Sequence, residues 1–355
     1  MSRRRRFAVA GVVAGGLVAS TAAVLAAQRQ LASRIRHVPD PDAREPFGSL
    51  HSRGRVVLAD DGVPLHVEEL GDPAARPTVV FVHGFSLSMD SWHYQRRDLP
   101  DVGRLVFYDQ RSHGASGRGS KEHATLDQLG RDLFSVLLST APEGPVVLIG
   151  HSLGGMTIMA LAEQHPEMFG RRIVGVALLS TASGQIADTV FGLPRRAGRV
   201  LKIAAPVVVP RLASRSALLE RGRSVSGDLS FLVTRWFAFG RHASPSLVAF
   251  LERMLAATPI DVILEFLPTF LDHDRVGALA ALRGVETLIL TGARDTLITP
   301  DHSQAIAEVL PDAELVQLAD AGHMVTLERP ALVNLHLRAF IRRAGRARRR
   351  RAASA

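Results

Sequence analysis

The stretch VVLIGHSLGG, residues 146–155, restricts the possible folds of this chain more than any other part of the sequence. Four apolar residues suited to a buried strand lead into Gly150, and a histidine, a serine and two more glycines follow. Glycines at such a point permit a sharp change of direction, and the residues after them predict a helix. The stretch therefore predicts a strand, a tight turn that carries Ser152, and a helix. Such units build sheets with helices on their faces.

The same alternation of strand and helix continues along most of the chain. Thr125 opens a helical stretch with Gln128 three residues later, which is the pattern of a capping box. Further helices are predicted at 156–165 and 331–343. The middle strands are continuously apolar, as in sheets covered on both faces. The sequence predicts an α/β fold with a mostly parallel eight-stranded sheet and helices on both faces. The predicted strands are 55–59, 65–70, 78–83, 105–109, 146–150, 174–180, 287–291 and 315–318.

Residues 184–275 interrupt this alternation. They contain no convincing strand, but they offer helical runs at 229–239, 245–257 and 262–270. Seven of the fifteen phenylalanines and Trp236 lie here. We predict a helical insertion between two strands. Its aromatic side chains either pack the insertion onto the body or line an apolar pocket, because both uses need the same residue types.

Ser152 is the candidate nucleophile, and the alternative is an unreactive polar residue in a tight turn. A serine hydroxyl becomes reactive only with a base, a group that orients the base, and N–H donors for the oxyanion. The pattern Gly150-x-Ser152-x-Gly154 between a strand and a helix raises the hydroxyl at the carboxyl edge of the sheet. The N–H of Leu153, near the positive end of the helix, can then face the developing oxyanion.

The sequence supplies the remaining parts at fitting positions. His83 and Gly84 end a predicted strand, and their loop is expected to provide the Phe85 N–H as a second oxyanion donor, while His83 supports the loop. Asp295 follows the strand at 287–291, and His323 follows the last strand. With 143 residues from Ser152 to Asp295 and 28 more to His323, the order Ser, Asp, His fits one fold.

Competing residues are less well placed. Asp301 and Asp320 are the alternatives to Asp295, and the histidines at 113, 123 and 302 are expected at the surface or in loops. The chain has no cysteine, which excludes disulfides and a cysteine nucleophile. It has neither an H-E-x-x-H cluster nor a G-x-G-x-x-G loop between strand and helix, so no metal and no cofactor are expected.

Together these motifs resemble the α/β-hydrolase fold, in the branch that includes esterases and lipases. HGF, YDQRSHGASG, GHSLGG, GARDTLITP and AGH occur in the family's order and cover about residues 55–343. The resemblance implies that residues 184–275 form a cap over the active site. It also implies structural roles for Asp109 and Arg111, in a loop where Ser112 replaces the usual glycine.

A serine at the nucleophile position disfavours the alkyl-enzyme chemistry of the family's dehalogenases and epoxide hydrolases, which use Asp there. The leading hypothesis is hydrolysis of a carboxylic ester through an acyl-enzyme on Ser152, with Asp295 and His323 completing the triad. The aromatic insertion favours an apolar acyl or alcohol part, such as that of a lipid ester. Acyl transfer, carbon–carbon-bond hydrolysis and perhydrolysis by the same triad stay open, as does a non-catalytic binding protein.

The net charge of +9 belongs to the two ends of the chain. Residues 1–36 and 342–355 hold seven arginines each and no acid, which leaves 29 basic against 34 acidic residues in between. The body is therefore about −5, which argues against a nucleic-acid partner. The expected partner is a small-molecule or lipid ester.

The N-terminal end carries a candidate membrane signal, with a soluble, unprocessed N-terminus as the remaining alternative. Residues 7–27 are uncharged and follow four arginines, so residues 1–36 are predicted to be a membrane anchor or a cleaved export signal. The arginine distribution slightly favours a catalytic body outside the cytoplasm, anchored or secreted. Residues 37–54 are predicted to be a spacer, 55–183 and 276–343 the core, 184–275 the cap, and 344–355 a disordered tail. The tail is either a solvated charge run or a contact for anionic lipid headgroups.

Overall fold

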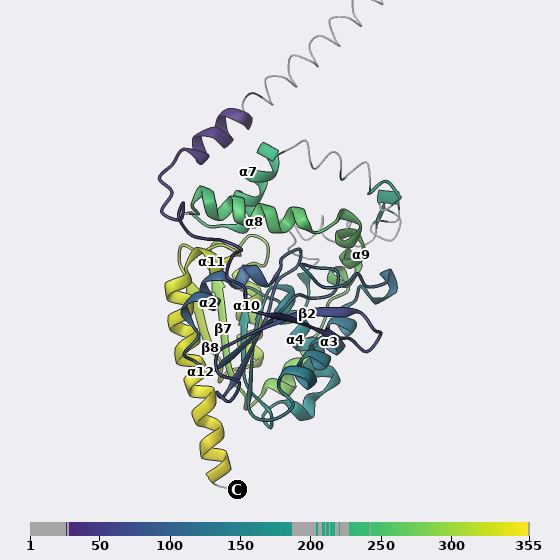
Figure 1. Cartoon of the computed structure of the whole chain (residues 1–355), viewed down its shortest axis with the longest axis vertical. Helices are drawn as coiled ribbons and strands as arrows, with labels where there is room; N and C mark the ends of the chain where they lie inside the picture. The colour runs from purple at the N-terminus through teal and green to yellow at the C-terminus, as the bar shows by residue number, and fades with distance from the viewer. Residues whose placement is uncertain are drawn as a thin grey trace, which may run out of the picture.

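The computed structural model describes residues 26, 28–186, 227–241 and 243–353, with isolated positions between 204 and 220. A single eight-stranded sheet in the order β1-β2-β4-β3-β5-β6-β7-β8 forms its centre (Figure 1). β2 pairs antiparallel with β1 and β4, and every other neighbouring pair is parallel. The strands are β1 Gly54–Leu58, β2 Pro64–Leu70, β3 Thr78–Val82, β4 Arg104–Tyr108, β5 Val146–His151, β6 Ile173–Leu179, β7 Glu286–Gly292 and β8 Glu314–Leu318.

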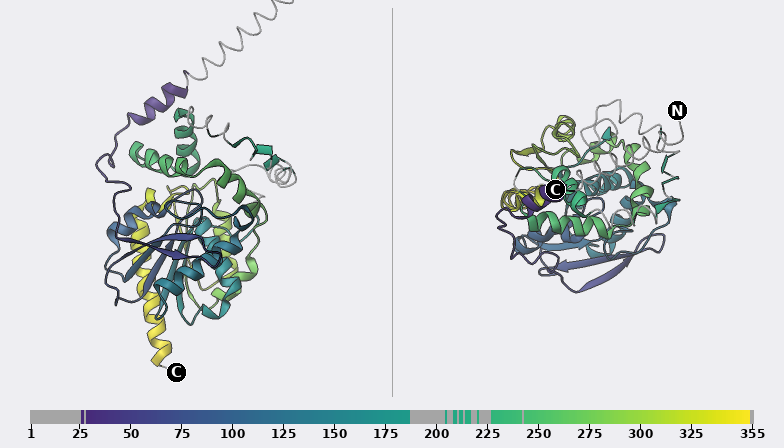
Figure 2. Two further views of the ribbon diagram at one scale, coloured as in Figure 1. Left: turned by 45° about the vertical axis from the view of Figure 1, so that its right-hand side comes forward. Right: turned by 90° about the horizontal axis from the view of Figure 1, so that it is seen from above.

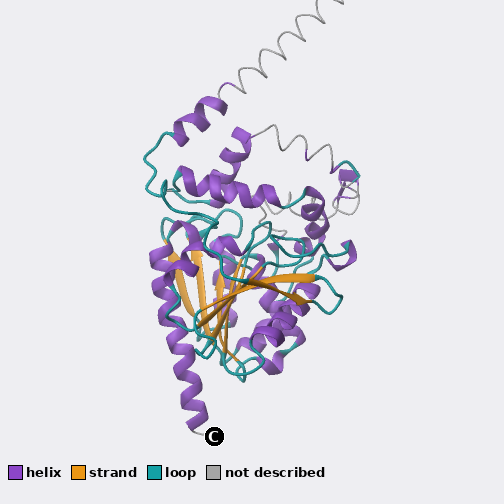
Figure 3. Cartoon of the chain, in the orientation of Figure 1, coloured by secondary structure: helices purple, strands orange, loops and turns teal. Residues whose placement is uncertain are grey.

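Helices cover both faces of the sheet, as Figure 3 shows by colour. Along β3, Val80 and Val82 face the layer of α3, α4 and α10, while Val79 and Phe81 face the layer of α2 and α12. The middle strands are apolar at every position because both of their faces are buried. The helices are α2 His93–Asp98, α3 Leu126–Thr140, α4 Leu153–Gln164, α7 Gly227–Ala238, α8 Pro245–Ala257, α9 Ile260–Leu271, α10 Pro300–Val309, α11 Val325–Glu328 and α12 Pro330–Ala353.

The predicted N-cap of α3 is present, but only half of the capping box forms. The Thr125 hydroxyl accepts a hydrogen bond from the Gln128 N–H at 3.2 Å. The side chain of Gln128 does not turn back to Thr125, and instead donates to Asp60 at 2.6 Å and Asp132 at 3.2 Å. Its position is set by distant carboxylates, which a local pattern does not reveal.

The described part of the insertion is helical, and α7, α8 and α9 lie beyond the carboxyl edge of the parallel strands (Figure 2). Its two ends meet at a single antiparallel bridge between Gly184 and Asp274. The N–H of Arg275 donates to Ser183 O at 2.6 Å beside it. The two ends of the insertion therefore lie side by side where the chain leaves β6 and returns to β7.

The predicted spacer, residues 37–54, is in contact with both the core and the insertion. Glu45 accepts from His93 of α2 at 2.8 Å, and Asp40 accepts from the hydroxyl of Ser246 in α8 at 2.7 Å. Phe47 stacks on Phe250 of α8 with ring centroids 4.6 Å apart. This segment thus connects a helix of the core to a helix of the insertion.

The C-terminal tail differs from its prediction. The prediction of a disordered tail is wrong up to residue 353, because α12 continues through Ala353. Arginine and alanine are strong helix formers, and Arg343 fixes the start of this region by pairing with Glu286 and Glu314. Within the described part of the chain, none of the helices has the length and apolar character needed to cross a membrane. The predicted membrane segment, residues 7–27, lies outside the described residues apart from residue 26.

Candidate active site

Ser152 lies in a sharp turn between β5 and α4. Its φ of +53° is uncommon for a residue with a side chain. Its N–H donates to Leu179 O at 2.9 Å, and its carbonyl accepts from the Thr181 hydroxyl at 2.7 Å. The flanking glycines are required by close contacts, since a Cβ on Gly150 would lie 2.5 Å from the Gly154 backbone, and one on Gly154 would lie 2.0 Å from Val82 O. The turn therefore stores backbone strain at the candidate nucleophile.

Asp295 and His323 are brought together at the same edge of the sheet. Nδ1 of His323 is 2.8 Å from Oδ2 of Asp295. The other oxygen of Asp295 accepts from the N–H groups of Leu297 and Ile298, both at 2.9 Å. The carboxylate is fully buried, and the imidazole is 9% exposed. Because an ionised carboxylate only accepts, Nδ1 carries the proton, and Nε2 presents a lone pair that can take a proton.

His151 links the loop of His323 to the turn of Ser152. Nε2 of His151 donates to the carbonyl oxygen of His323 at 2.9 Å, and the two rings lie 4.9 Å apart. Burial lowers the pKa of His151 to about 3, so its ring is neutral. The residue directly before the serine thus holds the histidine loop. The sequence prediction missed this role, although His151 occupies the variable position of the G-x-S-x-G motif.

The loop after β3 packs against the same cluster. His83 is fully buried, and its Nε2 accepts from the Gln110 N–H at 2.9 Å while Nδ1 donates to Gly84 O at 2.7 Å. Burial lowers the pKa of His83 to about 4, which leaves the ring neutral. A Cβ on Gly84 would lie 2.9 Å from Nδ1 of His151, so the loop can approach this closely only with glycine. The neutral, doubly bonded His83 is suited to holding the loop.

The two candidate oxyanion donors belong to these elements. Leu153 is the first residue of α4, where an N–H has no acceptor within the helix. Phe85 follows Gly84, and its ring contacts Phe266 and Phe270 of α9 with centroids 5.9 and 4.8 Å away. The insertion therefore contacts the loop expected to hold the oxyanion.

The acid bonded to Nδ1 of His323 is Asp295, rather than its competitors Asp301 and Asp320. Asp301 lies in the first turn of α10, and Asp320 is half exposed, 3.8 Å from Arg294. The expectation of a surface or loop position is wrong for His302, which is 9% exposed on α10. His113 does lie in a loop but is 1% exposed, and burial lowers its pKa to about 3. Sequence alone did not reveal either burial, because the covering residues are distant in the chain.

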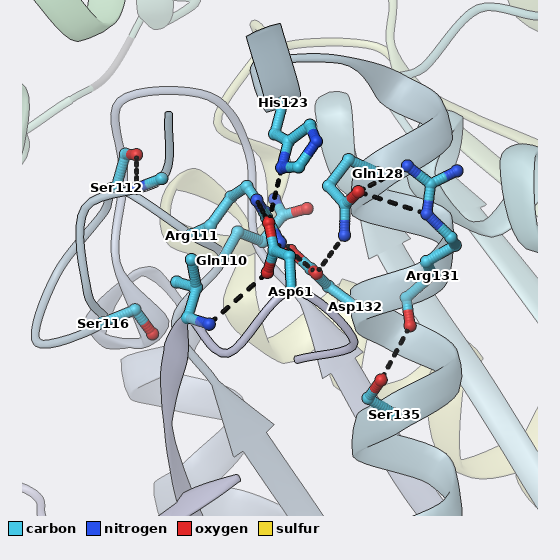
Figure 4. A network of polar contacts seen from close by, with 12 residues as sticks. Asp61, Gln110, Arg111, Ser112, Ser116, His123, Gln128, Arg131, Asp132 and Ser135 are labelled. Carbon is cyan, nitrogen blue, oxygen red and sulfur yellow. Dashed lines mark hydrogen bonds and ion pairs between the residues drawn. The ribbon is translucent and has the colours of Figure 1, made fainter. Parts of the chain in front are cut away.

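Asp109 and Arg111 hold loops together, and Figure 4 shows the contacts of Arg111. Asp109 accepts from the N–H groups of Met89 at 2.7 Å and Ala115 at 2.8 Å. Arg111 is fully buried. Its Nε and Nη2 each donate to an oxygen of Asp132 at 2.6 Å, and Nη1 and Nη2 donate to Asp61 at 2.8 and 3.0 Å. All of these donors are used within the protein, which agrees with a structural role.

A cavity of about 510 Å³ is lined in part by the loop that follows Gly84. It is lined by α8, by the segment around Phe47 and His51, and by the carboxylates of Glu68 and Asp109, but not by Ser152, Asp295 or His323. Among the described residues, no group of three or more histidine or acidic side chains is arranged to hold a metal ion.

Comparison with known proteins agrees with the fold. The sequence profile of the α/β hydrolase fold matches residues 77–330. The chain belongs to the α/β-hydrolase family. It is an enzyme of this family, and its relatives are esterase-, lipase- and lactonase-type hydrolases.

Individual α/β-hydrolases are similar to it at low identity. A mouse sn-1-specific diacylglycerol lipase is 27% identical over 293 residues, 80% of this chain and 87% of that protein. A 3-oxoadipate enol-lactonase of Acinetobacter baylyi is 25% identical over 288 residues, 81% of this chain and 96% of that protein. The structure of a thermophilic esterase from Thermogutta terrifontis superposes with a TM-score of 0.64 at 22% identity, covering 82% and 99% of the two chains. The similarity to the esterase structure shows that the two proteins share a fold.

Proposed function

We propose that the protein is a serine hydrolase that cleaves a carboxylic ester with an apolar acyl or alcohol part. The observation that carries the proposal is the buried Asp295–His323 pair, whose loop is bonded through His151 to the turn that bears Ser152. Strain at Ser152, a base and an orienting acid are the components of nucleophilic acyl chemistry.

The reaction proceeds in two halves. The Ser152 oxygen attacks the ester carbonyl while its proton passes to Nε2 of His323, and the Leu153 and Phe85 N–H groups bind the oxyanion. The alcohol leaves with the proton from Nε2, and the acyl group stays on Ser152. Water then gives a proton to Nε2 and attacks the acyl carbon, and the acid departs as the proton returns to Ser152. Asp295 stabilises the imidazolium in both halves.

The apolar substrate part is supported by the side chains around the serine turn. Leu153 and Met156 of α4 form one buried cluster with Val262 and Phe266 of α9, and Phe85 packs against it. An apolar group near Ser152 would therefore meet side chains from both the core and the insertion, as expected if the insertion is a cap. Relatives named as a lipase and a lactonase are consistent with an ester bond.

Labelling with a fluorophosphonate and an ester series tests the proposal. Wild type should be labelled and should hydrolyse p-nitrophenyl esters, with a preference for longer acyl chains. Ser152→Ala should lose labelling and about 10⁶-fold in kcat. Ser180→Ala is the matched control, because Ser180 also has a positive φ, 44°, directly after the neighbouring strand β6. Labelling that persists in Ser152→Ala would refute the assignment of the nucleophile.

The open chemistries are separated by product analysis. Labelled protein without ester turnover would favour carbon–carbon-bond hydrolysis, and turnover that rises with an added alcohol or thiol acceptor would favour acyl transfer. A new oxidising product with peroxide would favour perhydrolysis.

Membrane attachment through residues 7–27 is a further part of this proposal. It is supported by the sequence: 21 uncharged residues that follow four arginines. Full-length protein that sediments with membranes, while protein lacking residues 1–27 stays in the supernatant, is the expected result. Full-length protein found only in the supernatant contradicts it.

A further inference from the structure

Helix α7 exposes a line of large apolar side chains. Leu229, Val233 and Trp236 are 44%, 43% and 60% exposed. Their spacing of four and three residues places them on one face of the helix. The opposite face is buried, with Phe231 and Leu232 packed into the cluster shared with α8. Single exposed apolar residues are ordinary, but an aligned set on an amphipathic helix marks an interaction surface.

The helical segment next to α7 indicates what this surface meets. The helical segment 28–36 packs beside α7, with Ala32 fully buried in the same cluster. Nη1 of Arg36 is 2.5 Å from Oδ1 of Asp228, and its guanidinium lies 4.6 Å above the ring of Phe231. Both Figure 1 and Figure 2 show this segment next to the insertion. The preceding residues, 7–27, are the uncharged segment of the sequence.

The charge around the line of apolar residues suits an anionic lipid surface. Segment 28–36 and α7 contain a single acid, Asp228, which is paired with Arg36. Arginines near anionic headgroups contribute about 1 kcal/mol each, and tryptophan is enriched at the membrane–water interface. Arg36 is paired with Asp228, and the guanidinium of Arg235 donates to the carbonyl oxygens of Gly240 and Arg241, so Arg29 and Arg34 carry the surplus positive charge of these two helices.

We propose that the α7 face formed by Leu229, Val233 and Trp236 lies in the headgroup region of an anionic lipid bilayer. The amphipathic helix then runs parallel to the membrane plane with its apolar face inserted. If residues 7–27 enter the bilayer, as proposed above, segment 28–36 would hold α7 close to the lipid.

The contact lies close to the candidate active site. The last residue of α7, Ala238, accepts a hydrogen bond from the Met324 N–H at 2.9 Å, directly after His323. One carboxylate oxygen of Glu328 accepts from the N–H groups of Gly240 at 3.0 Å and Gly322 at 2.7 Å. The bilayer would thus lie near the site that is proposed to cleave apolar esters, although the lipid contact itself does not depend on that activity.

Tryptophan fluorescence tests the lipid contact in the full-length protein, because the chain contains only two tryptophans. Trp92 is 1% exposed and packs against Phe81, whereas Trp236 lies in the proposed surface. Vesicles of phosphatidylglycerol and brominated phosphatidylcholine should shift the emission to the blue and quench roughly half of it, because one of the two tryptophans reaches the bromines. Trp236→Phe should abolish both effects. Val233→Glu should weaken them severalfold, while Leu335→Glu, a control at a 62% exposed site on α12, should not.

Three outcomes would overturn the proposal. Unchanged emission from protein that floats with the vesicles would assign membrane binding to residues 7–27 or to the arginine-rich C-terminal tail, and not to α7. Quenching that persists in Trp236→Phe would exclude α7 as the contact. Protection of Trp236 from acrylamide that grows with protein concentration in the absence of lipid would assign the surface to a second copy of the chain. None of these measurements depends on catalysis, so their failure is distinct from failure of the proposed function.

Discussion

The Asp295–His323 and Asp132–Arg111 pairs are both buried contacts between a carboxylate and a basic side chain. Asp295, His323 and Arg111 lie in loops that follow strands, whereas Asp132 lies on α3. In the first pair Asp295 binds one imidazole nitrogen, and the other nitrogen remains available. In the second pair three guanidinium nitrogens of Arg111 are shared between Asp132 and Asp61. A guanidinium does not deprotonate in proteins, whereas an imidazole does so near neutral pH. Of these two buried pairs, only the one with an imidazole has a basic side chain that can accept and release a proton.

The largest effect that separates the two pairs should come from Asp295→Asn. An amide cannot stabilise the imidazolium and favours the wrong tautomer of His323, so kcat should fall about 10⁴-fold. The free energy of unfolding in urea should change by far less than the activation free energy that corresponds to this loss of rate. Asp301→Asn, which alters a carboxylate six residues further along, is the matched control and should keep near-normal turnover. Near-normal turnover in Asp295→Asn would transfer the orienting role to another acid.

The converse change is Arg111→Met, which should affect folding rather than chemistry. Removing one partner of a buried pair leaves Asp132 uncompensated, which costs about 3–5 kcal/mol of unfolding free energy. The double variant Arg111→Met/Asp132→Asn should recover part of this loss, because the fully buried charge of Asp132 is then removed, while Asp61 keeps its contact with His123. Urea unfolding measures both variants. An equal loss in single and double variants would contradict the electrostatic explanation.

Features that depend on local sequence patterns could be predicted from the sequence. All eight strands begin and end within two residues of the predicted bounds, and the insertion helices lie where the sequence predicts them, because hydrophobic runs are local patterns. Asp295 and His323 could be chosen because each follows a strand, and β7 and β8 are neighbours in the sheet.

The features that the sequence did not predict depend on partners far along the chain. Arg111 meets Asp61 across fifty residues, and Gln128 turns to Asp60 instead of completing its capping box. The burial of His302 and the contact of Asp40 with Ser246 of α8 also depend on residues that are far apart in the sequence. No local window contains both partners of such a contact. The helical course of α12 to Ala353 differs, since its residues are good helix formers and charge alone suggested disorder.

A third buried pair, Glu68 with Arg96, should weaken in acid. Burial alone would raise the pKa of Glu68, but the hydrogen bond from the Ser52 N–H and the charge of Arg96 outweigh it and hold the pKa at about 2. Because the folded-state pKa lies below the unfolded one, the stabilisation is complete above about pH 5 and is lost as the pH falls towards 2. Its upper limit is about 3 kcal/mol.

Urea unfolding of wild type and Glu68→Gln between pH 6 and pH 3 measures this effect. The difference between the two proteins should shrink as the pH falls, since the glutamine does not titrate. A difference that stays constant over this range would show that Glu68 contributes through packing or neutral hydrogen bonds.

The smallest effect is expected at Ser112, another of the serines with a positive φ. Ser112 has a φ of +64°, close to the +53° of Ser152, but its hydroxyl accepts from the Gly119 N–H at 3.0 Å. Ser112→Gly relieves the left-handed backbone and loses this hydrogen bond, two terms of about 1 kcal/mol each and of opposite sign. The unfolding free energy should therefore change by less than about 1 kcal/mol. Ser112→Ala loses the hydrogen bond and keeps the strain, so it should be the less stable of the two variants. If Ser112→Ala were as stable as Ser112→Gly, strain at this position would be negligible, and a positive φ would not by itself distinguish the turn of Ser152.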